Sequence, residues 1–196
     1  MIKDRITNSK LNNIRVIDNF FTEEIHHEIF KLMCRPKWGL VGGTPESPFW
    51  HMDDLQLEDY FSHYLFEIIQ NKFEINTKIK RIYANGQTAG QNGTPHSDSA
   101  DDFSLTFIYY PNLKWKFVWG GHLTFLDMKS VCRDTSKKIR KEIHESTYFP
   151  TNTTNSVSYV PNRGILFPSN IWHYAQPPNR TCTGLRTSLA YKLELL

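Results

Sequence analysis

A histidine and an aspartate stand two residues apart within segment 93–99, as His96 and Asp98. Side chains alternate along an extended backbone, so this pair points to one side and can ligate one ion. Two histidines and one carboxylate, with positions left open, are typical of non-haem Fe(II) sites, which therefore need a third ligand. We select His173, because it alone precedes an Arg-x-Ser pair, Arg186 and Ser188. This order predicts a metal site followed by a guanidinium suited to a carboxylate.

Other residues compete for two of these roles. His122 and His144 are the alternatives for the third metal ligand. His122 follows a Gly-Gly turn and could line the pocket, whereas His144 lies in a polar insertion. Arg180 and Lys192 are the alternatives for the carboxylate-binding cation. The order of the motifs favours His173 and Arg186 over them.

Size, charge and cysteine usage narrow the class of protein. With 196 residues and no long apolar run, the chain is expected to form one domain, 1–196, that does not span a membrane. The start of the chain lacks the apolar core of a signal peptide, and the three cysteines form no C-x-x-C pair. We therefore expect a cytoplasmic protein with free thiols. The net charge is +3 with scattered basic residues, which argues against nucleic acid as a partner, and no pattern indicates an oligomeric state.

The spacing of apolar residues predicts helices first and strands afterwards. Thr22, followed by two glutamates, predicts a helix that ends before Pro36, and a helical stripe covers residues 57–73. Residues 35–54 are rich in Gly, Pro and Trp and predict an ordered loop. About eight short strands follow, interrupted by a polar insertion at 128–156. The predicted fold is mainly β with flanking helices (α+β): helical support over about 20–73 packs outside a β core over about 78–194.

Several segments together resemble the 2-oxoglutarate- and Fe(II)-dependent dioxygenases, and among them the prolyl 4-hydroxylase-like branch, over roughly residues 13–194. Besides the motifs above, the segments are RIY at 81–83, LTFIYY at 105–110, WGGHLTF at 119–125, GILFP at 164–168 and LRTSLA at 185–190. The resemblance implies a double-stranded β-helix, a jelly-roll and cupin-like fold, with the metal inside its mouth. The chain departs from that branch in the longer spacing from His173 to Arg186 and in having Arg where Lys is often found.

The resemblance also implies cofactors and residue roles. Fe(II), held by His96, Asp98 and His173, would bind 2-oxoglutarate, and O2 would take the remaining position, with ascorbate as a further candidate cofactor. Arg186 would pair with the far carboxylate of 2-oxoglutarate, assisted by Ser188. Further candidates for contact with 2-oxoglutarate are Tyr83, Tyr110 and Thr106, the last because it shares strand parity with Tyr110. Candidates for the substrate groove are Trp119, Trp172, Tyr109, Trp115 and Trp50, with core packing as the alternative for each.

The expected activity is hydroxylation of a prolyl or other residue of a protein or peptide, with release of succinate and CO2. Hydroxylation of a free amino acid or another small molecule is the alternative with the same metal site. The alternative of a different class is a non-catalytic β-helix module that binds or senses a ligand. A metal triad together with an acid-binding cation favours an enzyme, because a binding module needs no such combination.

Overall fold

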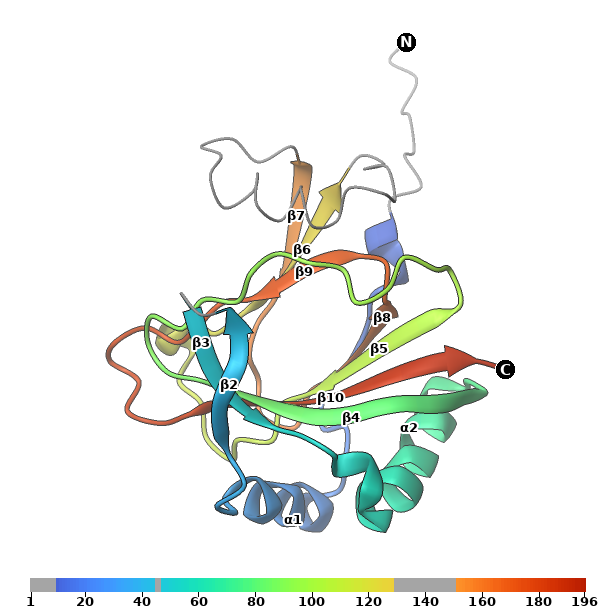
Figure 1. Ribbon diagram of the computed structural model, residues 1–196, viewed down its shortest axis with the longest axis horizontal. Coiled ribbons are helices and arrows are strands. Elements are labelled where there is room, and N and C mark those ends of the chain that lie inside the picture. The colour runs from blue at the N-terminus through green and yellow to red at the C-terminus, as the bar shows by residue number, and fades with distance from the viewer. Residues whose placement is uncertain (1–9, 45–46, 129–150) are drawn as a thin grey trace.

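Two facing antiparallel sheets and two helices outside the larger sheet make up the fold (Figure 1). The computed structural model describes residues 10–44, 47–128 and 151–196. The larger sheet has the order β1-β8-β5-β10-β4-β3-β2, with β1 Arg15–Ile17, β8 Gly164–Pro168, β5 Ser104–Tyr109, β10 Arg186–Leu195, β4 Thr77–Gln87, β3 Ser47–Met52 and β2 Gly39–Thr44. The smaller sheet has the order β7-β6-β9, with β7 Thr151–Val157, β6 Leu123–Met128 and β9 Trp172–Ala175.

The first helix, α1 Glu23–Met33, begins where the sequence predicts. The hydroxyl of Thr22 accepts a hydrogen bond from the amide of Ile25 at 3.4 Å, and the two glutamates of the first turn favour the positive end of the helix. Its buried face carries Ile29 and Met33. The helix thus covers the larger sheet with one apolar stripe, as predicted.

The second predicted helix is less regular than its apolar stripe indicates. A 3-10 turn, η2 Leu55–Leu57, precedes a π-helical turn, η3 Tyr60–Leu65, which leads into α2 Phe66–Phe73. Of the predicted stripe, Phe61, Leu65, Ile69 and Phe73 are buried and Ile68 is partly buried, whereas Leu57 is 79% exposed. Leu57 escapes burial because the chain turns between η2 and η3, which breaks the helical spacing at that point. No helix in the described part of the chain is long and apolar enough to cross a membrane.

Side chains alternate between the two faces of the central strands and so contribute to two separate hydrophobic cores. Phe107 and Tyr109 of β5 belong to the core between the larger sheet and the helices, whereas Ile108 and Tyr110 belong to the core between the two sheets. On β10, Leu189 lies on the helix side and Ala190 on the inner side. Residues 186, 188 and 192 share the parity of residue 190. The inner face of β10 therefore carries its polar residues into the space between the sheets.

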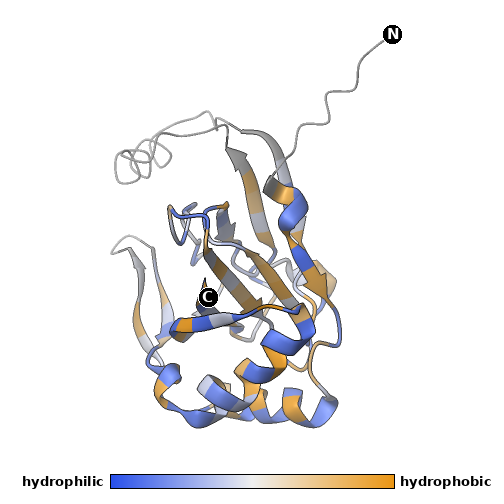
Figure 2. Cartoon of the chain, turned by 90° about the vertical axis from the view of Figure 1, so that its right-hand side faces the viewer, coloured by the Kyte–Doolittle hydropathy of each residue, from blue (hydrophilic) through white to orange (hydrophobic). Residues whose placement is uncertain are grey.

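Residues 35–54 do not form the predicted loop. They contain the hairpin β2–β3, which lies at one edge of the larger sheet (Figures 1 and 2). Trp50 and Met52 of β3 pair with Gly86 and Ala84 of β4. Strand structure therefore begins before the predicted boundary near residue 78. The glycines and proline weaken the local strand signal, and pairing with β4 supplies the hydrogen bonds that stabilise the hairpin. Most of the predicted insertion, including His144, lies outside the described residues.

Candidate metal centre

His96 and His173 are paired directly through their backbones. The His96 amide donates to the His173 carbonyl at 3.0 Å, and the His173 amide donates to the His96 carbonyl at 2.8 Å. This isolated bridge places the His96 segment alongside β9. Residues opposite each other in an antiparallel pair project to the same face, and the two imidazole centroids are 4.6 Å apart. Asp98 follows two residues later, anchored by its amide to the Ser169 carbonyl at 2.8 Å.

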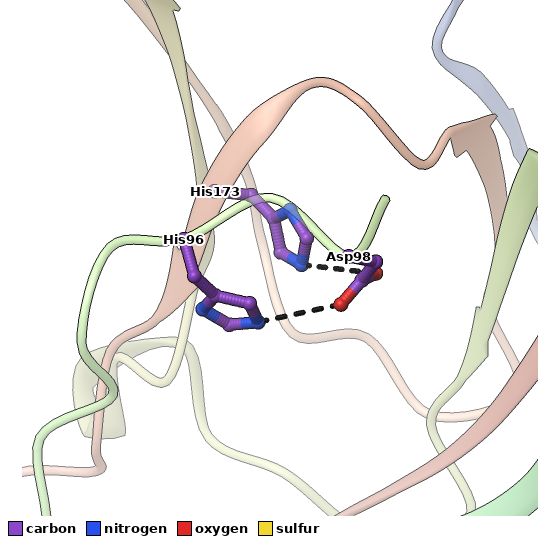
Figure 3. Close-up of side chains that lie close together, drawn as sticks. All are labelled: His96, Asp98 and His173. Carbon is purple, nitrogen blue, oxygen red and sulfur yellow. Dashed lines mark ion pairs between the residues drawn. The ribbon is translucent and has the colours of Figure 1, made fainter. Parts of the chain in front are cut away.

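The three side chains direct their ligand atoms toward one another (Figure 3). One ligand atom from each residue lies within 4.8 Å of the other two. Nε2 of His96 is 3.4 Å from Oδ1 of Asp98, and Nε2 of His173 is 3.5 Å from Oδ2. The predicted triad of His96, Asp98 and His173 is therefore brought together although its members come from distant parts of the chain.

The second nitrogen of each imidazole is engaged by the backbone. Nδ1 of His96 lies 2.7 Å from the Thr94 carbonyl, and Nδ1 of His173 lies 2.9 Å from the Ile171 carbonyl. A carbonyl can only accept, so Nδ1 carries a proton in both rings, and in the neutral imidazole Nε2 then has the free lone pair. Such hydrogen bonds orient metal-binding histidines. Two neutral imidazoles and one carboxylate are a donor set that fits Fe(II).

Burial and charge favour the protonation states that a metal site needs. Burial lowers the pKa of His173 to about 4, so this imidazole is neutral near pH 7. Burial alone would raise the pKa of Asp98, but the Lys192 ammonium and the neighbouring His173 and His96 together outweigh burial and hold the pKa well below its usual value. The carboxylate is therefore ionised and the imidazole neutral, with no proton to be displaced from either before metal binding.

The Asp98 carboxylate is held from the side away from His96. The Thr106 hydroxyl donates to Oδ2 at 2.6 Å, and the Lys192 ammonium contacts the same oxygen. The Ser169 hydroxyl is 2.9 Å from that of Thr106. Because Oδ2 is already engaged twice, Oδ1 is the better placed ligand atom. The sequence indicated Thr106 as a 2-oxoglutarate contact, and the structure shows in addition its bond to the predicted metal ligand Asp98.

Arg186 is buried between the sheets with only neutral oxygens as hydrogen-bond partners in the described chain. Its Nε donates to the Gly121 carbonyl at 2.8 Å and its Nη1 to Oε1 of Gln87 at 3.0 Å. The residue is 1% exposed, and no described carboxylate forms an ion pair with it. Gly121 has φ +80°, and a Cβ there would lie 3.2 Å from Arg186, so glycine suits this turn. A buried cation without a counter-ion is unfavourable, which makes this position suited to an anionic ligand.

Two tyrosine rings, stacked on each other with centroids 4.1 Å apart, lie beside the guanidinium. Its central carbon lies 5.5 Å from the ring centroid of Tyr110 and 5.2 Å from that of Tyr159. Tyr159 was not predicted, and its hydroxyl donates to the Thr187 carbonyl at 2.6 Å. The Tyr110 hydroxyl is buried and makes no hydrogen bond with a described group. A ligand carboxylate beside Arg186 would supply the missing acceptor, so this region fits the predicted co-substrate. Ser188 is buried two residues along β10.

A cavity of about 270 Å³ opens beside Asp98. Its polar lining consists of the cations Lys80, Arg81 and Lys192, the serines Ser99, Ser104 and Ser169, and Tyr83 with Asp98 itself. Tyr83, a predicted 2-oxoglutarate contact, lies in this wall with its ring 5.6 Å from the Lys192 ammonium and 4.7 Å from the guanidinium of Arg81. Lys192 is separated from Arg186 and Ser188 by an even number of residues along one strand. Its side chain is therefore expected on the same, inner face, and this spacing can be read from the sequence.

The predicted substrate residues do not line this cavity. Tyr109 is fully buried on the helix side of β5, where its hydroxyl lies 2.5 Å from Nδ1 of His26 and donates to Asn162 at 3.0 Å. Its predicted role in a substrate groove does not fit this placement, because odd-numbered positions of β5 face the helices. Trp115 packs on Tyr159 at the Arg186 end of the barrel.

The remaining tryptophans are partly buried. Trp119 packs against Trp115 with ring centroids 5.2 Å apart, and Trp172 neighbours His173 on β9 with opposite strand parity. Trp50 lies on β3 opposite Gly86. Roles in substrate binding for these three stay predictions.

The structure distinguishes the alternatives for the third metal ligand and for the carboxylate-binding cation. His122 does not join the group of His96, Asp98 and His173. Its Nδ1 is buried without a hydrogen-bond partner among the described groups. Arg180 lies exposed in the connection between β9 and β10. Lys192, by contrast, contacts the predicted metal ligand Asp98, so the inner face of β10 carries two cations rather than one.

Comparison with known sequences identifies no relative. No family model matches the chain, and no curated protein matches it. Its fold, by contrast, is shared with many solved structures.

Three of the similar structures are an epimerase, a protein with bound 2-oxoglutarate and a prolyl-4-hydroxylase. One is a non-haem α-ketoglutarate-dependent epimerase, SnoN from nogalamycin biosynthesis, with TM-score 0.68, 10% identity and coverage of 93% of this chain and 78% of that one. HygX from Streptomyces hygroscopicus, solved with nickel and 2-oxoglutarate bound, has TM-score 0.68, 11% identity and coverage of 93% and 83%. A Pseudomonas putida prolyl-4-hydroxylase has TM-score 0.62, 13% identity and coverage of 94% and 93%. The chain therefore has the mainly β, double-stranded β-helix fold of the 2-oxoglutarate- and Fe(II)-dependent oxygenases, as predicted.

Proposed function

We propose that this chain is an Fe(II)- and 2-oxoglutarate-dependent oxygenase. The observation that carries the proposal is the convergence of His96, Asp98 and His173 in the same barrel as Arg186, a buried cation paired only with neutral oxygens. The overall reaction balances as follows: 2-oxoglutarate, O2 and a substrate C–H group give succinate, CO2 and a C–OH group. One oxygen atom enters succinate and the other enters the substrate.

The residues of the site have different roles in this proposal. His96, His173 and Asp98 hold the metal, which supplies the oxygen-activating chemistry when it is bound. Thr106 and Lys192 fix the orientation of the Asp98 carboxylate. Arg186 and the Tyr110 hydroxyl bind the far carboxylate of 2-oxoglutarate, and Ser188 assists from the same strand face. The apolar rings of Phe125 and Phe167, packed near His173, exclude water from one side of the site.

Two substrate classes are compatible with this site. A prolyl or other residue of a peptide is one class, and the prolyl-4-hydroxylase among the similar structures supports it. A free amino acid or another small molecule is the other, supported by the epimerase SnoN. The predicted aromatic groove is absent from the cavity beside Asp98, whose lining is mainly polar and cationic. This cavity favours the second class.

Succinate formation tests the proposal without knowledge of the substrate. The protein is mixed with Fe(II) and 2-oxoglutarate without oxygen, then exposed to air, and succinate is measured over time. The wild type should release succinate slowly, and both His173→Ala and a chelator should abolish the release. His63→Ala is the matched control, because His63 is 78% exposed on the outer helical turn.

A non-catalytic module would behave differently in the same experiment. Absence of succinate, together with absence of Fe(II)-dependent 2-oxoglutarate binding, would rule out the oxygenase. Binding without turnover would support the binding or sensing module. Equal succinate from wild type and His173→Ala would show that His173 is not the third ligand.

A further inference from the structure

The cavity beside Asp98 carries an excess of positive charge. Three of its lining residues, Lys80, Arg81 and Lys192, are cations, and Asp98 is its one lining carboxylate within the described chain. Lys192 lies deepest, with its side chain 18% exposed, whereas those of Lys80 and Arg81 are 44% and 49% exposed at the rim. The depth of Lys192 matters because an ion pair is screened less when it is partly buried.

The acids that pair with the two rim cations lie outside the cavity. Lys80 pairs with Glu194 at 3.2 Å and Arg81 with Asp53 at 2.8 Å, and neither acid is a lining residue. The acid that pairs with Lys192 is Asp98, which is also a predicted metal ligand. Once Asp98 shares its charge with a metal, the Lys192 ammonium is left incompletely neutralised. The inner wall of the cavity then favours an anionic group.

This cation is separate from the one assigned to the co-substrate. Arg186 stands at the start of β10, lies against Tyr110 and Tyr159, and is not a lining residue of the cavity. Lys192 lies six residues further along the same strand. The barrel therefore offers one buried cation for the far carboxylate of 2-oxoglutarate and a second cation beside the metal.

We propose that the substrate is a small molecule with an anionic group, carboxylate or phosphate, and that Lys192 binds this group beside the metal. The proposal rests on the proposed oxygenase function and specifies its substrate class. A volume of about 270 Å³ is at the low end for a ligand pocket, which suits a small molecule. The serine hydroxyls of the lining supply further donors to such an anion, and the contact of Lys192 with Asp98 brings the bound anion next to a residue of the candidate metal centre.

Ligand binding can be measured without turnover. The protein is loaded with Mn(II) and saturating 2-oxoglutarate, and proton relaxation of added ligands reports their approach to the paramagnetic ion. The probes are three acids, each with its own amide: acetate and acetamide, L-proline and L-prolinamide, L-leucine and L-leucinamide. Each acid should bind about 10- to 100-fold more tightly than its amide, the range expected for hydrogen bonds to a charged group.

Lys192→Met should bring the affinities of acid and amide to within about threefold of each other. Lys31→Met, at a side chain 72% exposed on α1, is the matched control and should keep the wild-type preference. Titration with inorganic phosphate distinguishes the two kinds of anion. If phosphate displaces the bound acids at a lower concentration than acetate does, the substrate group is a phosphate ester. If acetate displaces them at the lower concentration, the group is a carboxylate.

Three results would overturn the proposal. They are equal binding of acids and amides by the wild type, an unchanged preference in Lys192→Met, and a Lys192→Met variant that loses 2-oxoglutarate affinity but keeps the preference for acids. If the wild type binds neither Mn(II) nor 2-oxoglutarate, the oxygenase function fails. The acid and amide pairs are then compared by calorimetry on the metal-free protein, where equal affinities refute the anion site independently.

Discussion

The Thr106 hydroxyl donates a hydrogen bond of 2.6 Å to Oδ2 of Asp98, which connects an inner residue of β5 to a proposed metal ligand. Partners of this kind orient metal ligands, and their loss typically lowers metal affinity. The bond connects the larger sheet to Asp98, which, like His96, lies outside the named strands.

Thr106→Val should weaken Fe(II) or Mn(II) binding by about 10- to 100-fold, because the carboxylate loses one of the two groups that orient it. Competition with a metal indicator measures the change. Thr124→Val is the matched control, since Thr124 is also buried in a strand but bonds to Ser156 and Gln176 instead. Equal affinities for both variants would show that the Thr106 bond does not support the metal site.

Arg186→Met should raise the dissociation constant of 2-oxoglutarate by about 10- to 100-fold, because a charge-assisted hydrogen bond to its far carboxylate is lost. Calorimetric titration of the Mn(II)-loaded protein measures this change. Arg180→Met removes the same charge from an exposed position and should leave the constant unchanged. A larger effect from Lys192→Met than from Arg186→Met would transfer the co-substrate role to Lys192.

His26 should make folding sensitive to mild acid. Burial lowers the pKa of His26, whose imidazole bonds to the Tyr109 hydroxyl at 2.5 Å. The folded state therefore binds fewer protons than the unfolded chain, whose histidine has a pKa of about 6.5. Stability is fully present above that pH and decreases as pH falls through it toward the lower folded value.

The melting temperature tests this expectation. Between pH 8 and pH 5.5 it should fall more for the wild type than for His26→Gln, which cannot titrate. His27→Gln is the neighbouring control and should follow the wild type. Parallel curves for wild type and His26→Gln would contradict the expectation.

Gly164→Ala should destabilise the fold by about 1–3 kcal/mol, because an added Cβ would lie 2.5 Å from the Phe20 ring and 2.9 Å from Phe107. Both rings are fully buried and cannot move aside without disturbing the core. Gly184→Ala meets nothing within 4 Å and should change the free energy of unfolding little. Urea unfolding compares the two variants, and equal stabilities would show that the core around Phe20 adapts to the methyl group.

Local patterns in the sequence were sufficient for several features of this protein. The i, i+2 spacing places Asp98 on the face of His96 and places Ser188 on the face of Arg186, because side chains alternate along extended chain. The cap at Thr22 begins α1 for a similarly local reason. The order of the motifs along the chain was enough to choose His173 over His122.

The tertiary structure alone decided how these features meet. The reciprocal backbone bridge between His96 and His173 joins segments far apart in sequence, and no local pattern encodes such pairing. Pairing of β3 with β4, and of β2 with β3, likewise makes strands of residues 39–44 and 47–52, whose composition indicates a loop. The contact between Lys192 and Asp98 also depends on the closure of the barrel, since strand parity places Lys192 inside but does not select its partner. Sequence thus determined which residues face inward, and long-range pairing determined which of them touch.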